Sequence, residues 1–313
     1  MSYPFPLLRL PRLILCEVFK LMRIGEKIKL SLCSKKISTR INNARMYSQT
    51  VIVDLDCLSH KISVHFENDK ETFDIFVYLD TWKGHNLDTQ QFSITCCTVA
   101  VTSIQKGIQI FWKNRREGFL SVIQHLSQMF QCKISTSFNC HFSDLLQPTI
   151  SMLFDLQLEF KMICICFDGS KDENLYNQIS SNLGLVEYLN ISSSFNTGFE
   201  PVFTSWPQKI MIMGSAWFTL EYLLACTSTT ITLGWSHLGK KDLDEVLRNW
   251  KAGGFPNLER LKIQSRNITS FGATILGMNW MELNGMVIQT DDGSKKATIK
   301  LDFDTIKMSV TSF

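Results

Sequence analysis

Four short segments in the C-terminal half of the chain share one apolar pattern, and they decide how that half folds. They are LVEYLNIS (185–192), PQKIMIMG (207–214), STTITLGW (228–235) and NLERLKIQ (257–264). Each segment contains a pair of apolar residues that are separated by a single residue. The pairs are Leu189/Ile191, Ile210/Ile212, Ile231/Leu233 and Leu261/Ile263. Alternation of this kind is typical of a strand with one buried face, so each segment predicts a strand.

The spacing of these pairs predicts how the strands are connected. Successive pairs lie 21, 21 and 30 residues apart, and strand-plus-helix units of near-constant length are typical of leucine-rich-repeat solenoids. The match is imperfect, because only Val186 and Leu258 supply the apolar residue that such repeats carry three positions before the pair. The position usually occupied by Asn or Cys holds Ser194, Ser215, Ser236 and Arg266. We predict a repeat-like β/α stack; the alternative is an ordinary α+β domain whose strands share the pattern.

Further strands and helices are predicted on both sides of these segments. β-Branched and aromatic residues favour strands at 51–56, 61–66, 73–79, 92–101 and 108–112. Beyond residue 118 the pattern predicts strands at 133–138 and 158–167, and helices over 119–130, from Ser143 and over 243–252. Asp242 and Glu245 resemble a capping box at the start of the last helix. Residues 286–303 predict a hairpin that turns at 291–294, with a short strand at 308–310 after it.

Residues 10–42 predict three short helices. Leu10, Ile14, Val18, Leu21 and Met22 recur at a spacing of three to four residues, which gives one apolar stripe. Pro11 suits a first helical turn, where its missing N–H is not needed. We expect Gly25 to break this helix, a second helix to carry Ile28 to Cys33, and a third to pass through Ile37 and Ile41.

The charge is divided unevenly along the 313 residues. Residues 1–50 hold ten Lys/Arg and two acids, a net charge of +8, whereas the whole chain has only +3. The remaining residues therefore carry −5. A basic module joined to a mildly acidic one is expected, and the basic module could bind phosphates or an acidic protein surface.

The N-terminus does not resemble a secretion signal, and this bears on the ten cysteines. Arg9, Arg12 and Glu17 interrupt the apolar start, and the longest uncharged apolar run there is Leu13–Cys16. The best membrane candidate, 210–233, contains Glu221 and a Ser/Thr cluster and favours strand, helix, strand. We therefore expect an intracellular protein of the cytoplasm or nucleus, with reduced cysteines and no membrane span.

Motifs for catalysis or cofactor binding are missing from the sequence. It contains no phosphate-binding glycine loop, no nucleophile elbow and no paired-histidine zinc motif. Cys132 with Cys140 and His141, or Cys164 with Cys166, lacks the twice-repeated close pairing of a structural zinc site. The cluster Lys113-Asn114-Arg115-Arg116 beside Phe111-Trp112 could contact nucleic acid, but a solvated turn is the simpler interpretation. We expect no catalytic residue, no cofactor and no metal.

Residues 1–45 carry a family resemblance. Leu10-Pro11 at a helix start, the apolar residues Leu13 to Met22, and the closing helix around Ser34-Lys35 resemble an F-box, with matching spacing throughout. The segments FPLLRLPRLILCEVFK (5–20) and IGEKIKLSLCSKKI (24–37), followed by VIVDLD (51–56), are similar to nematode F-box proteins with an F-box-associated C-terminal region. Lys27 departs from the pattern, because many F-boxes have an apolar residue there; Ile28 is able to fill that role.

The resemblance implies a non-catalytic substrate-recognition subunit of a Skp–cullin–F-box ubiquitin ligase. It implies an F-box over 1–48 that binds a Skp-type adaptor, and through it a cullin, and a receptor domain over 49–313 that binds an unknown target protein. Within that domain we distinguish a strand-rich part (51–117), a repeat-like part (118–275) and a C-terminal hairpin (276–313). The expected fold is α+β: a small helical F-box followed by a larger α/β, leucine-rich-repeat-like domain.

Seven residues are predicted to form the adaptor-binding surface. About 40 residues make a marginal core, so three short helices need a partner to cover their stripe. Some of the seven could instead belong to the internal core of the helices. The alternative function is nucleic-acid binding through the basic N-terminal module. The predicted adaptor-binding residues are Leu10, Pro11, Ile14, Val18, Leu30, Leu32 and Ile37.

Overall fold

The computed structural model of the chain divides into two compact units. It describes residues 7–43, 50–69, 71–84, 88–94, 97–136, 144–166, 173–192, 202–268 and 274–312. The first unit is residues 1–159 and the second is residues 160–313. None of the helices in these described ranges is long and apolar enough to cross a membrane.

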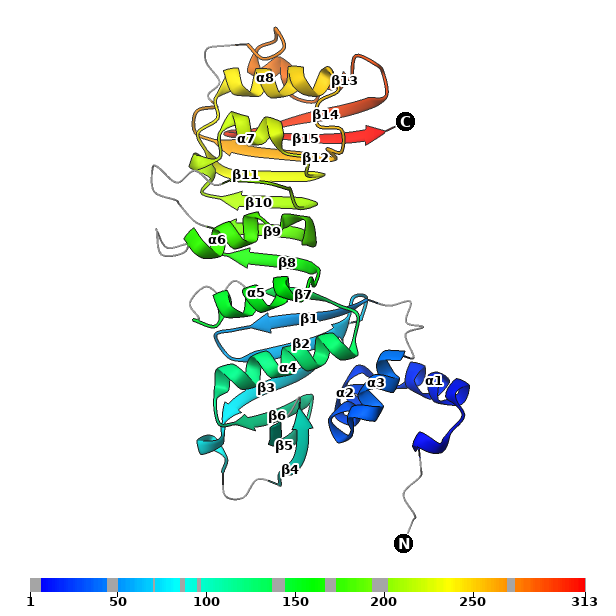
Figure 1. The fold of residues 1–313 in the computed structure, drawn as a ribbon. Coiled ribbons are helices and arrows are strands. Elements are labelled where there is room, and N and C mark those ends of the chain that lie inside the picture. The colour runs from blue at the N-terminus through cyan, green and yellow to red at the C-terminus, as the bar shows by residue number, and fades with distance from the viewer. Residues whose placement is uncertain are drawn as a thin grey trace. The chain divides into compact units, whose positions relative to one another are not determined.

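The first unit begins with the expected helices (Figure 1). A short 3-10 turn, η1 (Leu7–Arg9), precedes α1 (Arg12–Leu21), α2 (Ile24–Cys33) and α3 (Lys35–Asn43). The expectation that Gly25 breaks the pattern was wrong, because Gly25 lies in the first turn of α2. A Cβ there would collide with the ring of Phe73 on the neighbouring sheet, so the glycine permits close packing.

A seven-stranded sheet forms the body of the first unit. Its strand order is β7-β1-β2-β3-β6-β5-β4, with β1/β7 and β3/β6 parallel and the other pairs antiparallel. The segment expected to be one strand at 92–101 is two, because β4 and β5 fold back on each other as a hairpin. The strands are β1 (Val51–Asp56), β2 (Lys61–Phe66), β3 (Phe73–Leu79), β4 (Gln90–Ile94), β5 (Cys97–Ile104), β6 (Gly107–Trp112) and β7 (Cys132–Thr136).

Two helices complete this unit together with the 3-10 turn η2 (Asp80–Trp82). Helix α4 (Arg115–Met129) begins where the Asn114 side chain accepts hydrogen bonds from the Arg116 and Glu117 N–H groups. It buries Phe119, Ile123 and Leu126, as its periodicity predicts. Helix α5 (Leu146–Asp155) begins after Leu145; Ser143, from which this helix was expected to start, lies outside the described residues.

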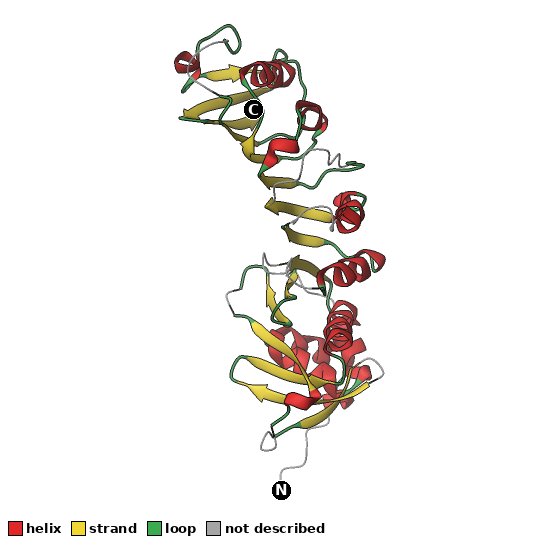
Figure 2. Ribbon diagram, turned by 90° about the vertical axis from the view of Figure 1, so that its left-hand side faces the viewer, coloured by secondary structure: helices red, strands yellow, loops and turns green. Residues whose placement is uncertain are grey.

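The second unit is built on a parallel sheet. Strands β8 (Phe160–Ile165), β9 (Val186–Ser192), β10 (Lys209–Met213), β11 (Thr230–Ser236) and β12 (Arg260–Ser265) pair in that order. Figure 2 shows α6 (Glu173–Ser180), α7 (Leu220–Ala225) and α8 (Lys240–Lys251) along one side of the strands. The 3-10 turns η5 (Leu183–Leu185) and η6 (Ser215–Trp217) lie in the connections.

The four apolar pairs of the sequence pattern lie side by side in this sheet. Leu189, Ile210, Ile231 and Leu261 are direct neighbours across β9 to β12. The second member of each pair, from Ile191 to Ile263, forms the next row, and every one of these eight side chains is buried. The recurring pattern therefore predicted these strands, and the structure places the residues of the pattern in matching register.

The C-terminal end of the sheet is antiparallel. Strand β15 (Thr305–Ser312) pairs with β12, β14 (Lys295–Asp302) with β15, and β13 (Val287–Gln289) with β14, while α9 (Trp280–Leu283) precedes them. The expected hairpin with a turn near 291–294 is confirmed. The mixed α/β class is also confirmed, but a leucine-rich-repeat-like domain is not. The connections differ from unit to unit, from the six-residue α7 to the twelve-residue α8.

One predicted cap was misplaced. Helix α8 begins at Lys240, three residues earlier than expected, so Asp242 lies in its first turn. Its carboxylate accepts a hydrogen bond from the Gly239 N–H at 2.7 Å. The carboxylate therefore stabilises the helix start from inside the helix, where negative charge is favourable.

Candidate functional site

Helix α1 has one buried and one exposed apolar face. Leu15 and Phe19 are 3 % and 0 % exposed and belong to the core of the first unit. Leu13, Ile14 and Leu21 are 77 %, 51 % and 87 % exposed. We call these three residues the α1 stripe. Large apolar side chains that recur along one exposed helix face are typical of a surface that binds another protein.

The seven residues predicted to bind an adaptor are not equally accessible. Pro11 and Ile14 are exposed, and Leu10, Val18 and Leu30 are half-buried. Leu32 and Ile37 are 4 % and 8 % exposed, so their side chains belong to the packing of this chain. Five of the seven therefore remain accessible, and the adaptor-binding role of the set stays a prediction.

Two of the most exposed members of this face were missing from the predicted set. Leu13 and Leu21 lie eight positions apart, which is about two helical turns and places them on one side of α1. That spacing was a usable signal. The predicted apolar stripe includes Leu21 but passes Leu13 by, and the predicted adaptor-binding set contains neither residue.

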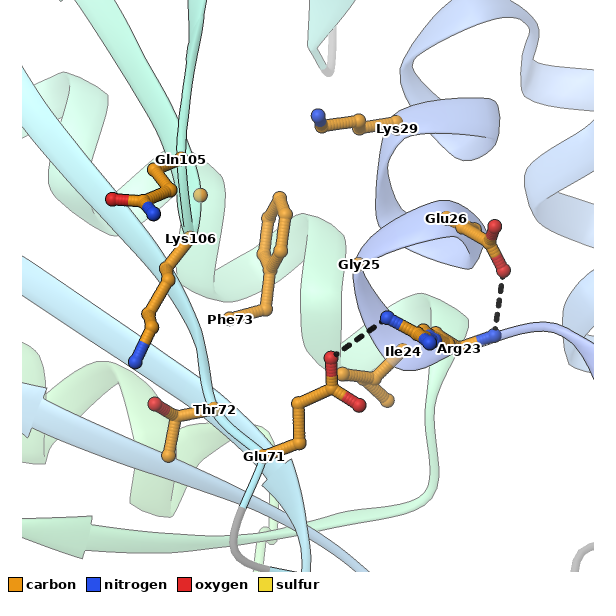
Figure 3. Close-up of a pocket in the computed structure, with 11 residues that line it drawn as sticks. Arg23, Ile24, Gly25, Glu26, Lys29, Glu71, Thr72, Phe73, Gln105 and Lys106 are labelled. Atoms are coloured by element: carbon orange, nitrogen blue, oxygen red, sulfur yellow. Dashed lines mark hydrogen bonds and ion pairs between the residues drawn. The ribbon is translucent and has the colours of Figure 1, made fainter.

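The helices are anchored to the sheet around the start of α2. A cavity of about 280 Å³ lies between α2, the start of β3 and the turn that joins β5 to β6, and Figure 3 shows the residues that line it. The Arg23 guanidinium donates to the Glu71 carboxylate at 3.3 Å, and the Arg23 N–H donates to the Glu26 carboxylate at 2.8 Å. Together with the contact of Gly25 on Phe73, these bonds fix where α2 starts on the sheet.

A second anchor joins α2 to α4. The Ser31 hydroxyl donates to the Ile28 carbonyl at 2.6 Å and lies 2.9 Å from Nε2 of His125. Because that hydroxyl proton is already used, Nε2 is the donor to the Ser31 oxygen. Burial lowers the pKa of His125 below its ordinary value, so the neutral ring is favoured.

Lys27 is a buried cation in the same contact. Its residue is 1 % exposed, and its ammonium lies 5.1 Å from the centroid of the Phe66 ring. Burial lowers the pKa of Lys27 to about 8, although nearby Glu26 opposes the shift. The departure from the F-box pattern noted at this position is thus a lysine that contributes to the packing of α2, beside the equally buried Ile28.

Several basic residues of the N-terminal module have partners inside the chain. Lys20 pairs with Glu17 at 2.7 Å, Arg23 pairs with Glu71, and the Lys27 and Lys29 ammonium groups lie over Phe66 and Phe73. These contacts reduce the positive charge that the module presents. They weaken the case for nucleic-acid binding there.

The second basic cluster has a structural use. The Arg115 guanidinium lies 4.9 Å from the centroid of the Trp82 ring, and its Nε donates to the Val77 carbonyl at 3.2 Å. Asn114 caps α4. Two of the four residues in the Lys113–Arg116 cluster therefore contribute to local packing and helix initiation.

The cysteines of the described ranges are free thiols, several of them buried. Burial raises the pKa of Cys132 to about 12 and also raises that of Cys226. The Cys166 thiol donates to the Ser192 carbonyl at 3.0 Å. Among the described residues, no group of three or more His, Cys, Asp or Glu side chains could hold a metal ion; Cys140 and His141 lie outside them.

Comparison with known families identifies the helices and part of the second unit. Residues 7–49 match the F-box domain family, and residues 202–263, which include β10, α7, β11 and α8, match the F-box associated family. These two matches support the resemblance to F-box proteins with an F-box-associated C-terminal region that the sequence carries. Both families are adaptor-type components rather than catalytic ones.

One relative extends this similarity over most of the chain. An uncharacterized protein of Caenorhabditis elegans is 20 % identical over 286 residues, which is 89 % of this chain and 65 % of the relative. The similarity is consistent with the nematode group of F-box proteins. No solved structure matches the chain.

Proposed function

We propose that the chain is the substrate-recognition subunit of a Skp–cullin–F-box ubiquitin ligase. Its F-box binds a Skp-type adaptor, and through it a cullin, while the C-terminal region holds a target protein. The observation that carries the proposal is the α1 stripe, because it leaves three large apolar side chains exposed within the segment that matches the F-box family. No catalytic residue is assigned, since ubiquitin transfer belongs to other subunits of such a complex.

The two faces of the F-box helices differ in a way that supports the proposal, because one face packs within the chain and the other is exposed. Leu15, Phe19, Ile28 and Leu32 are buried and hold the helices together and onto the sheet. The α1 stripe, with exposed Pro11 beside it, is left for the adaptor. Burying a large apolar side chain contributes about 1.5–3 kcal/mol, so a partner that covers the stripe gains several kcal/mol.

The decisive experiment is co-purification of the full chain with a Skp-type adaptor. We expect the wild-type chain to retain the adaptor and the double variant Pro11→Ala/Ile14→Asp to lose it, because a carboxylate is placed in the centre of the apolar contact. Leu32 is unsuitable for this test, since an aspartate at a buried site would disturb folding.

Leu58→Asp is the matched control. Leu58 is 48 % exposed, close to the 51 % of Ile14, but it lies in the turn between β1 and β2. This variant should retain the adaptor fully. Retention by both variants would refute the assignment of α1, and failure of the wild-type chain to bind any Skp-type adaptor would refute the proposed function.

The alternative of nucleic-acid binding through the N-terminal module predicts a different result. Affinity for DNA or RNA would fall steeply as salt is raised. We expect no retention of the chain on a polyanion column through this module, because part of its charge is paired internally.

A further inference from the structure

Three lysines form a row across the C-terminal sheet. Lys262 of β12 is the direct neighbour of Lys307 on β15, and Lys307 is the direct neighbour of Lys300 on β14. All three are exposed, while the residues between them along the strands, such as Ile263, Ile299 and Met308, are buried. The lysines therefore lie on the sheet face opposite the core. We call these three residues the lysine row.

The lysine row is unfavourable for the folded chain itself. Neighbouring strands lie about 4.8 Å apart, and like charges directly opposite each other destabilise a sheet. Among the described residues, the ion pairs of this row amount to one long contact, between Lys307 and Asp302 at 4.0 Å. Folding thus does not explain why three cations stand together here.

More positive charge and an aromatic side chain lie along the same strands. Arg260 is exposed on the same face of β12, two residues before Lys262. Just beyond the other end of β12, the Arg266 guanidinium lies 5.1 Å from the centroid of the Trp235 ring. Trp235 is 50 % exposed, so this Trp–Arg pair is open to a partner. Tryptophan and arginine are the residue types most enriched where binding energy concentrates in protein interfaces.

The backbone displays Trp235 through a strained conformation. Its φ is 55°, in the left-handed region that bulky residues avoid, and the pairing of β11 with β12 shifts register there. The preceding Gly234 carbonyl accepts hydrogen bonds from the Gly214 N–H and the Ser215 hydroxyl, each at 3.0 Å. Strain held in place by its surroundings is common at functional sites.

We propose that the lysine row, Arg260 and the Trp235–Arg266 pair bind an acidic segment of the target protein. This inference rests on the proposed function only in assigning the segment to a target. The row spans about 10 Å, which three or four residues of extended chain cover. Glu or Asp side chains on that segment neutralise the lysines, and an adjacent apolar side chain packs on Trp235.

An acidic protein segment fits this surface better than nucleic acid does. A protein that binds duplex DNA commonly neutralises about 6–10 phosphates, and a binder of single strands offers several aromatic platforms. The surface has five cations and one aromatic side chain, Trp235, and it is bordered by Asp302 and Asp304 with the exposed Phe303 between them. Those carboxylates repel a phosphate backbone that continues past the cations. A short acidic segment covers the cations alone and so avoids this repulsion.

Binding is tested with the full chain and a labelled peptide. The probe is a fluorescein-labelled peptide of four glutamates followed by a phenylalanine, measured by anisotropy at low and physiological salt. We expect saturable binding that weakens with salt. The triple variant Lys262→Gln/Lys300→Gln/Lys307→Gln should bind about tenfold more weakly or worse, and Trp235→Ala should lose the preference for the phenylalanine-containing peptide over one with glycine there.

The matched control removes the same charge elsewhere. Lys106→Gln/Lys113→Gln/Lys241→Gln alters three exposed lysines away from the row and should bind within about twofold of wild type. Equal loss in both triple variants, absence of peptide binding to the wild-type chain, or tighter binding of a short single-stranded DNA than of the peptide would overturn the proposal. Thermal unfolding of each variant checks its folding. Adaptor co-purification is scored separately, so its failure would refute the proposed function without deciding the peptide result.

Discussion

The F-box helices and the C-terminal sheet both expose side chains that folding alone does not favour, but the two surfaces differ in chemistry. On α1 the exposed residues are large and apolar, within a module too small to bury all of its stripe. On the sheet they are lysines aligned across strands whose opposite face is fully packed. An apolar helix face suits a permanent partner, whereas a charged face suits a selective, salt-sensitive one. The comparison supports the proposal of an adaptor on the F-box helices and a target on the C-terminal sheet.

The largest expected effect tests whether the F-box helices depend on their close contact with the sheet. Gly25→Ala places a methyl group against the Phe73 ring. By helix propensity alone, alanine would stabilise α2 by nearly 1 kcal/mol. We expect the opposite, a loss of about 1–3 kcal/mol in the free energy of unfolding, because the ring or the helix has to move. Urea denaturation, followed through the unfolding transition of the first unit, measures this loss in the free energy of unfolding.

Gly184→Ala is the control for this substitution. Gly184 lies in η5 of the second unit, and a Cβ there meets no atom within 4 Å. Its unfolding free energy should change by less than about 0.5 kcal/mol. If Gly25→Ala proved neutral or stabilising, the packing of α2 on the sheet would not matter for stability, and the F-box helices would be independent of the sheet.

The different outcomes of sequence prediction in the two regions have a physical cause. In the sheet of the second unit, Leu189 to Ile263 follow a period of two, and adjacent strands follow each other in sequence. Local pattern and neighbour order are then sufficient to predict the register. In the F-box helices, the position of α2 depends on residues far away in sequence. Gly25 meets Phe73 and Ser31 meets His125, and neither contact is visible in helical periodicity.

The same reasoning applies to the candidate sites. The F-box motif pointed to the N-terminal helices, where Pro11 and Ile14 of the predicted adaptor-binding set are exposed. Leu32 and Ile37 are buried because α2 and α3 pack inside the first unit. The lysine row could not be found from sequence, because its three members become neighbours only when β15 turns back to pair with both β12 and β14.

The next effect concerns the buried cation of the F-box. The pKa of Lys27 is lowered from 10.5 to about 8 in the folded chain, so the unfolded chain binds more protons between these two values. Stability therefore rises as pH increases from about 8 to about 10.5 and is reduced below that window. Lys27→Met should stabilise the first unit by about 1–2 kcal/mol at pH 7 and abolish that rise. Chemical denaturation from pH 7 to pH 10 measures both effects.

Lys29→Met serves as the comparison for Lys27. The Lys29 ammonium lies 5.9 Å from the Phe73 ring, but its residue is only half-buried. The substitution should change the unfolding free energy by less than about 0.5 kcal/mol. If the Lys27→Met chain is less stable than wild type, the Lys27 charge stabilises the folded first unit. Lys27 and the lysine row would then no longer both be charges that folding disfavours.

A smaller gain is expected from removing the lysine row. Lys262→Gln/Lys300→Gln/Lys307→Gln relieves two direct cross-strand repulsions, and each is worth about 0.2–1 kcal/mol. We expect the second unit to gain on the order of 0.5–1 kcal/mol, more at low salt than at high salt. Thermal unfolding at two salt concentrations measures this gain. A loss of stability would mean that the lysines serve the sheet itself, and the contrast with α1 would fail.

The smallest effect comes from His125, and it sharpens the comparison by testing the anchor between α2 and α4. Burial lowers the pKa of this histidine in the folded chain, while in the unfolded chain it titrates near 6.5. As pH falls below about 6.5 the unfolded chain takes up the proton first, so the first unit loses stability on acidification and regains it at neutral pH. His125→Gln retains an N–H donor for Ser31 but has no proton to gain. We expect its unfolding free energy to depend less on pH between pH 7 and pH 5 than that of wild type. Identical pH profiles for wild type and His125→Gln would show that His125 is not buried in its neutral form between α2 and α4, which would contradict this anchor of the F-box helices.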